Sequence, residues 1–88
     1  MLHILHRSPQ SGDFKACLGR IDPATDDILL IADAVYAVLT LNMPEGISLY
    51  ALERDLKARG VTANAAVMVI DDAGFVALTE KHSSSLSW

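Results

Sequence analysis

The chain has 88 residues, a net charge of −4 at pH 7 and a single cysteine, and 51% of its residues are hydrophobic. This length predicts one domain, residues 1–88, and the excess of 11 acidic over 7 basic side chains argues against direct binding of nucleic acid. One cysteine cannot form an internal disulfide, and no apolar run approaches the ~20 residues that cross a bilayer. The N-terminus also lacks the pattern of a signal peptide, so the expected location is cytoplasmic, with no membrane role.

Strands and helices alternate in the first half of the chain. Residues 1–6 form a short apolar-rich run, and a loop follows it. Residues 13–21 are predicted to form a helix capped by Asp13 or Ser11, because apolar side chains recur there at helical spacing. These side chains are Phe14, Cys17, Leu18 and Ile21. Residues 28–32 are continuously apolar, which is typical of a strand covered on both faces.

The middle of the chain continues this alternation. Asp33 is a predicted N-cap, and the helix after it, residues 34–41, has apolar side chains on nearly every side. A helix of that kind is buried all round, by its own domain or by a neighbour. A strand at residues 47–51 and a short helix at residues 52–59 follow, and Gly60 lies where a helix C-terminus favours glycine.

The last third supplies one more strand and one more helix. Residues 65–70 form the fourth predicted strand, and Asp71 or Asp72 caps the final helix. The inward face of that helix should consist of Phe75, Leu78 and Thr79. Residues 83–87 are a polar tail that ends on Trp88. The pattern predicts an α/β fold of three layers, with a four-stranded, mainly parallel sheet between helices.

The familiar motifs of cofactor and metal sites are missing. No glycine-rich dinucleotide or phosphate motif follows the first strand, so no cofactor is expected. His3 and His6 are the only closely spaced histidines, and the lack of a cysteine or acidic cluster beside them argues against a metal site. Two aspartate pairs, Asp26 with Asp27 and Asp71 with Asp72, lie at element junctions, where capping and solvation explain them better than acid–base catalysis.

Three segments together resemble the DsrH/TusB family of sulfur-relay subunits. They are M-L-H-I-L-H-R-S-P at the start, Y-A-L-E-R-D-L-K-A-R-G in the middle and F-V-A-L-T-E-K-H-S-S-S-L-S-W at the end. Their order and the final tryptophan match the family, and the resemblance covers nearly the whole chain. The segment at residues 41–46 looks shorter than is usual in the family.

This resemblance implies a small flavodoxin-like fold and a place in a heterohexamer. In that assembly, homologous subunits of the DsrE/TusD and DsrF/TusC types join a chain of this type in each of two heterotrimers. The TusB branch carries persulfide sulfur toward 2-thiolation of the wobble uridine, so its relation to tRNA is indirect. The principal sulfur-accepting cysteine belongs to the DsrE/TusD-type partner. The resemblance therefore implies an accessory, non-catalytic subunit of a sulfurtransferase complex.

The residues leave open which branch of the family the chain represents. The first and last segments favour the TusB branch. Cys17 favours the other branch, because DsrH-type chains carry a cysteine in the first helix where TusB-type chains commonly have an aliphatic residue. A TusB-like role in tRNA thiolation is the main prediction, and a DsrH-like role in dissimilatory sulfur oxidation is the alternative.

Cys17 itself has two interpretations. It shares the inward face of its helix with Phe14, which predicts burial, and Asp13, four residues earlier, should oppose ionisation of the thiol. A thiol buried among apolar side chains has a raised pKa and is inert. The alternative interpretation, which rests on the DsrH-like position, is an auxiliary persulfide carrier.

The apolar excess of so small a chain predicts a surface that partners cover. The predicted contributors are Trp88 and, in the helix at residues 34–41, Val35, Tyr36, Val38 and Leu39. Alternatively, this helix is simply sandwiched within its own fold. Two other classes of function remain: a self-assembling binding module without sulfur chemistry, and a receiver-like phosphoacceptor at Asp33 or Asp71, for which the chain is short.

Overall fold

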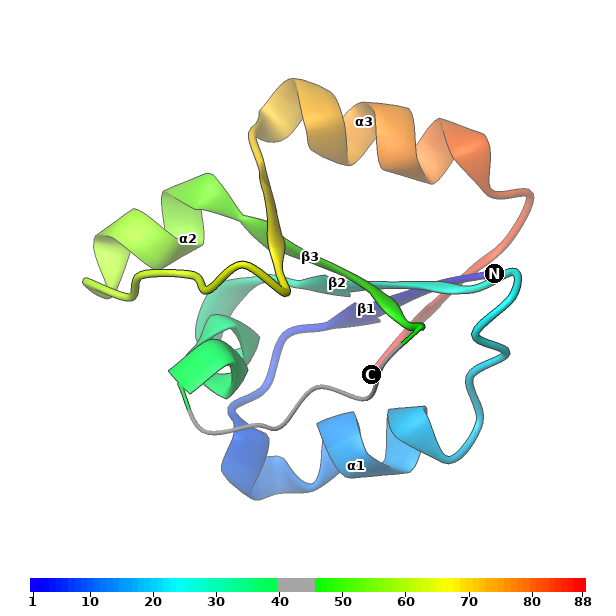
Figure 1. The fold of residues 1–88 in the computed structure, drawn as a ribbon, viewed down its shortest axis with the longest axis horizontal. Helices are drawn as coiled ribbons and strands as arrows, with labels where there is room; N and C mark the ends of the chain where they lie inside the picture. The colour runs from blue at the N-terminus through cyan, green and yellow to red at the C-terminus, as the bar shows by residue number, and fades with distance from the viewer. Residues whose placement is uncertain (40–45) are drawn as a thin grey trace.

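A computed structural model shows an α/β fold built on one five-stranded parallel sheet (Figure 1). The structure describes residues 1–39 and 46–88. In chain order the elements are β1 (Leu2–Leu5), the 3-10 turn η1 (Pro9–Ser11), α1 (Asp13–Leu18), β2 (Asp27–Leu30), the 3-10 helix η2 (Ala32–Leu39), β3 (Ser48–Leu52), α2 (Glu53–Ala58), β4 (Met68–Ile70), α3 (Asp72–Lys81) and β5 (Ser85–Ser87). The strands lie in the order β4-β3-β2-β1-β5, which is compatible with the predicted flavodoxin-like class.

The helices are divided unequally between the two faces of the sheet. From β1 to β4 each strand lies beside the one before it, so the crossovers of uniform hand put α1, η2 and α2 on one face. The chain then returns across the sheet to place β5 beyond β1, which puts α3 on the other face. In Figure 1, α3 lies above the sheet, and α1 and η2 lie below it.

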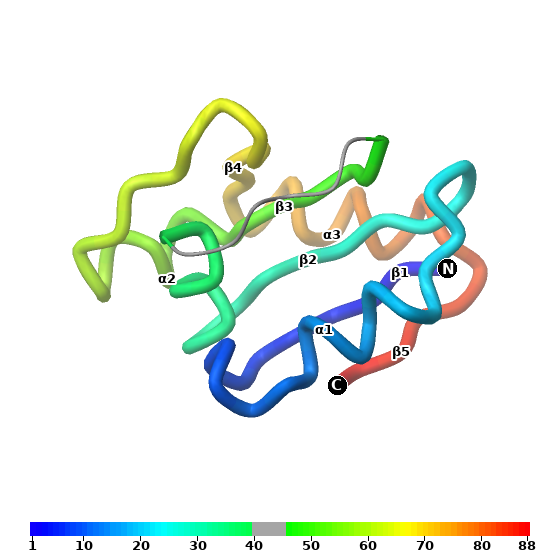
Figure 2. The backbone as a smooth tube through the Cα atoms, turned by 60° about the horizontal axis from the view of Figure 1, so that its bottom comes forward, coloured from blue at the N-terminus to red at the C-terminus, as the bar shows by residue number. Residues whose placement is uncertain are grey.

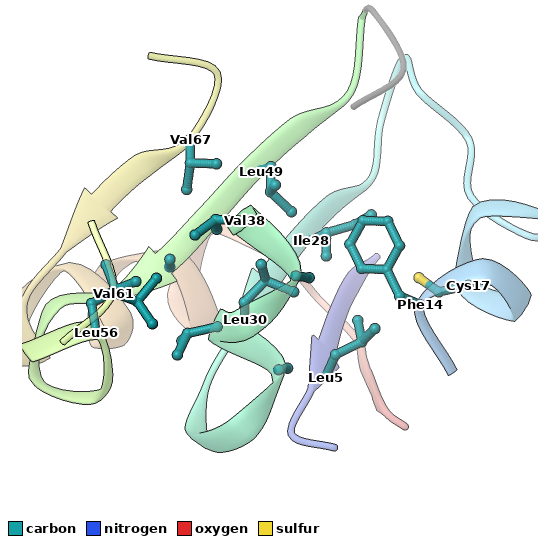
Figure 3. Close-up of a cluster of buried hydrophobic side chains, with 14 residues drawn as sticks. Leu5, Phe14, Cys17, Ile28, Leu30, Val38, Leu49, Leu56, Val61 and Val67 are labelled. Atoms are coloured by element: carbon teal, nitrogen blue, oxygen red, sulfur yellow. The ribbon is translucent and has the colours of Figure 1, made fainter. Parts of the chain in front are cut away.

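Each face of the sheet has its own apolar cluster. The larger cluster, shown in Figure 3, includes Leu5, Phe14, Cys17, Ile28, Leu30, Val35, Val38, Leu49 and Leu56. The smaller cluster consists of Leu2, Leu29 and Leu78, with Ile4, Tyr50 and Phe75 partly buried against it. Strand β2 is buried along its whole length, because alternate side chains of a central strand enter opposite clusters.

The prediction of four strands was wrong, because the tail at residues 83–87 contains a fifth. Strand β5 pairs in parallel with β1, and the register places Leu2 opposite Ser85 and Ile4 opposite Ser87. All three side chains of β5 are exposed. No apolar pattern therefore marks this strand in the sequence, and main-chain hydrogen bonds alone identify it.

Some element boundaries also differ from the prediction. The helix predicted at residues 34–41 is the 3-10 helix η2, which is described as far as Leu39. The fourth strand covers only Met68–Ile70 instead of residues 65–70. The segment at residues 41–46, expected to be short, lies outside the described residues except for Gly46, so that expectation remains untested.

A strained turn joins β2 to η2. Ala32 has a φ of +48°, in the left-handed region, and its N–H donates to Asp55 Oδ2 at 2.8 Å. Next to this turn, Arg59 Nε donates to Asp33 Oδ1 at 3.0 Å.

Asp71 caps α3, because its Oδ1 accepts a main-chain N–H of the first turn at 2.8 Å. Both aspartates considered as phosphoacceptors thus have structural partners.

The smaller cluster should be essential to stability although it holds few residues. Leu29→Ala removes a fully buried side chain between β2 and α3, and we expect it to lower the free energy of unfolding by about 2–5 kcal/mol. Val76→Ala, on the exposed side of α3, is the matched control and should change it by less than about 0.5 kcal/mol. Urea unfolding followed by circular dichroism compares the two. Equal effects of both variants would show that α3 does not cover a true core.

Candidate partner surface and buried cysteine

Cys17 lies inside the larger cluster. Its side chain is fully buried, and Figure 3 shows it beside Phe14 on the sheet-facing side of α1. Residues three apart on a helix lie on the same face, which is why these two side chains enter the core together. The thiol therefore has no direct route to a reagent or to another protein in this conformation.

The environment of Cys17 also keeps its thiol neutral. Burial, and secondarily the negative charge of Asp26, raise the pKa of Cys17 to about 11. With such a pKa roughly one thiol in ten thousand is ionised at pH 7. The sequence suggested that Asp13 would supply the opposing charge, but the structure assigns this effect to Asp26, which lies just before β2. Asp26 lies outside α1, so helical spacing could not reveal its effect on the thiol.

Asp26 is the centre of a polar cluster at the amino end of the sheet. Its Oδ1 accepts a hydrogen bond from the ammonium of Met1 at 2.9 Å, and its Oδ2 lies 3.0 Å from His3 Nε2. Hydrogen bonds from His3, from the main chain of Asp22 and from the N-terminus hold the pKa of Asp26 well below its usual range. This carboxylate is therefore ionised at neutral pH, and it accepts all of these hydrogen bonds.

Trp88 joins the same cluster from the other end of the chain. Its indole Nε1 lies 3.3 Å from His3 Nδ1, its main-chain N–H donates to Ile4 O at 2.9 Å, and Arg20 lies over the ring at 5.6 Å from the centroid. An indole N–H can only donate, so Nδ1 of His3 accepts and the ring proton lies on Nε2, facing Asp26. Trp88 is thus partly buried against its own fold, a position that the sequence did not suggest.

Asp27, the next residue, forms a second cluster on the opposite face of the sheet. Its Oδ2 accepts hydrogen bonds from His82 Nε2 at 2.7 Å and from Lys81 Nζ at 3.0 Å. Burial raises the pKa of Asp27, but the hydrogen bonds and positive charge of His82 and Lys81 outweigh it, and the net shift is downward. This cluster fastens the end of α3 to the start of β2.

Within residues 1–39 and 46–88, no three or more His, Cys, Asp or Glu side chains are grouped to hold a metal ion. His3 is buried and His6 is exposed, so the two histidines do not converge. No pocket is found in the described part of the chain, and none of its helices is long and apolar enough to cross a membrane.

Several apolar side chains remain on the surface. In η2, Tyr36 is 37% exposed and Leu39 is 60% exposed, whereas Val35 is fully buried and Val38 is only 6% exposed. The sequence left open whether this helix meets partners or is sandwiched within its own fold. The two valines pack within the fold, and Tyr36 and Leu39 are the side chains of this helix that remain exposed. Outside η2, the large exposed apolar side chains in the described part of the chain are Met1, Met68 and Val69 in β4, Val76 in α3 and Leu86 in β5.

The structure thus places Cys17 in the core and leaves apolar side chains of η2, β4, α3 and β5 on the surface. The family model described as "DsrH like protein" matches residues 7–85. Relatives named "Protein TusB" include those of Serratia proteamaculans (strain 568), 47% identical, of Shigella sonnei (strain Ss046), 43% identical, and of Escherichia coli O1:K1 / APEC, 43% identical. Each alignment covers the whole of both chains. The chain belongs to the DsrH/TusB family of sulfur-relay subunits.

Burial of the thiol predicts slow chemical modification. In the native protein at neutral pH, a thiol reagent should label Cys17 at least roughly a hundredfold more slowly than in the unfolded chain, because reaction requires opening of the core. The control is the double variant Cys17→Ser, Tyr36→Cys, which moves the only thiol to an exposed position and should react rapidly. Equally rapid labelling of the native protein and the control would show that Cys17 is accessible.

Proposed function

We propose that this chain is an accessory, non-catalytic subunit of a persulfide sulfur-relay complex that supports 2-thiolation of the tRNA wobble uridine. The observation that carries this proposal is the burial of Cys17 in a member of a sulfur-relay family. A sulfur-accepting cysteine needs an accessible thiolate, and a thiol with a pKa of about 11 provides almost none at neutral pH. The chain's contribution is therefore structural, through contacts with partners.

The proposed partners are two homologous small subunits, of the TusC/DsrF and TusD/DsrE types, in a cytoplasmic heterohexamer. The exposed apolar side chains support a partner surface, with Tyr36 of η2 as the proposed contact from this face. The net charge of −4 supports an indirect relation to tRNA, in which the relay and not this chain delivers the sulfur. The relatives named "Protein TusB" favour this branch over a DsrH-like role in sulfur oxidation.

Cys17 could carry sulfur only after a structural change. A persulfide donor transfers its outer sulfur to an attacking thiolate and leaves as a thiolate itself, so both sulfur atoms must meet. The full burial of Cys17 prevents this in the folded chain. We therefore propose that Cys17 is part of the core, and the auxiliary carrier is the alternative that the labelling experiment tests.

The partner surface predicts different outcomes for two neighbouring substitutions in η2. Tyr36→Asp places a charge at an exposed position, so the isolated chain should stay folded while co-purification of the partner subunits is reduced. Val38→Asp places the charge in the larger cluster and should destabilise the chain itself by roughly 3 kcal/mol or more. Thermal unfolding of each isolated chain separates the two effects. A folded Tyr36→Asp chain that still assembles fully would exclude this contact.

The proposed pathway predicts a change in tRNA. Deletion of the gene should reduce 2-thiouridine at the wobble position, measured by mass spectrometry of total tRNA nucleosides. Expression of the wild-type chain should restore the modification, and so should Cys17→Ser if the thiol is only structural. Unchanged 2-thiouridine in the deletion strain would contradict the TusB-like function.

Co-purification separates this proposal from a self-assembling module. If the chain is purified alone, without small homologous subunits, the self-assembling module becomes the better account.

A further inference from the structure

The last strand lies at the edge of the sheet. Strand β5 is a three-residue edge strand with exposed side chains, and it pairs only with β1. Figure 2 shows it along the margin of the sheet, with the C-terminus on the side of α1. A strand so short is weak by itself, so the contacts of Trp88 should decide whether it stays paired.

The hydrogen bond between Trp88 and His3 exists in only one protonation state. Nδ1 of His3 accepts from the indole, and Nε2 donates to the ionised Asp26. A second proton can therefore be added only at Nδ1, which is the atom that faces Trp88. Protonation would place two N–H groups against each other where the nitrogens are now 3.3 Å apart. The contact must then break.

We propose that β5 and Trp88 form a pH-sensitive latch, which neutral His3 holds closed and which protonation of His3 at Nδ1 opens. In the closed state, Trp88 packs against the larger cluster, next to α1. In the open state, residues 85–88 leave β1, and both the edge of β1 and this part of the cluster become accessible. Acidification would then expose a surface that residues 85–88 otherwise cover.

The charges around His3 act in opposite directions. Asp26 stabilises a protonated ring, whereas the Met1 ammonium and Arg20 oppose it. Cys17, on α1, is neutral, and across the sheet the charge of Asp27 is matched by Lys81 and His82. Because Asp26 remains beside Nε2 in both states, a proton added to His3 can be retained without loss of the Asp26 contact. Only the link to Trp88 is lost, so the effect of the proton is confined to the latch.

Trp88 is the only tryptophan, so its fluorescence reports directly on the latch. Between about pH 8 and about pH 5, the range in which histidine titrates, the emission of the full-length chain should shift to the red while far-UV circular dichroism is retained. His6→Gln and His82→Gln remove the other two histidines and should leave the shift in place. His3→Asn keeps an oxygen acceptor near the position of Nδ1 but does not titrate, so it should abolish the shift.

Hydrogen exchange provides a readout that does not depend on fluorescence. The main-chain N–H of Trp88 donates to Ile4 O, and this bond is broken when residues 85–88 leave β1, so its protection should be lost on acidification. Trp88→Phe keeps an aromatic ring without the donor, so protection of the residue 88 amide should be low and unchanged across the same range.

Three results would overturn the latch. The first is an unchanged emission while the ring signals of His3 show that it has been protonated. The second is a His3 ring that stays neutral down to about pH 5. The third is a red shift that coincides with loss of circular dichroism, which would mean unfolding of the whole domain.

Discussion

A parallel sheet must be covered on both faces, and the helices of this chain are divided unequally between them. Helices α1, η2 and α2 cover one face, and α3 alone lies over the other. Apolar side chains consequently remain on the surface, among them Tyr36 in η2, Met68 and Val69 in β4, and Val76 in α3. The hydrophobic content of the sequence is thus explained without a larger core.

Two successive aspartates fix the ends of the chain to this sheet. Side chains of neighbouring residues in an extended segment point to opposite faces, so Asp26 faces α1 and Asp27 faces α3. Asp26 binds the N-terminus and, through His3, the final residue Trp88. Asp27 binds the C-terminal end of α3. The same geometry places a negative charge near the buried thiol, so the interactions that close the fold also keep the thiol neutral.

The sequence predicted what depends on local pattern and missed what depends on distant contacts. Alternating apolar runs identified the α/β class, and helical spacing placed Cys17 on the inward side of α1. Strand β5 was missed because its serine-rich side chains are exposed and only its backbone pairs. The pairing of Asp26 with His3 joins positions 23 residues apart, which no spacing rule connects. In the same way, the apolar pattern of η2 could not separate the buried Val38 from the exposed Tyr36.

The claim that this chain serves sulfur relay by contact, and not through its own thiol, is tested most directly by intact-mass measurement. The native complex, purified with its partners, would be treated with a persulfide donor at neutral pH, and each subunit weighed under non-reducing conditions. The buried, neutral thiol predicts an added sulfur on the TusD/DsrE-type partner and none on this chain. An added sulfur on this chain that disappears in the Cys17→Ser variant would contradict it.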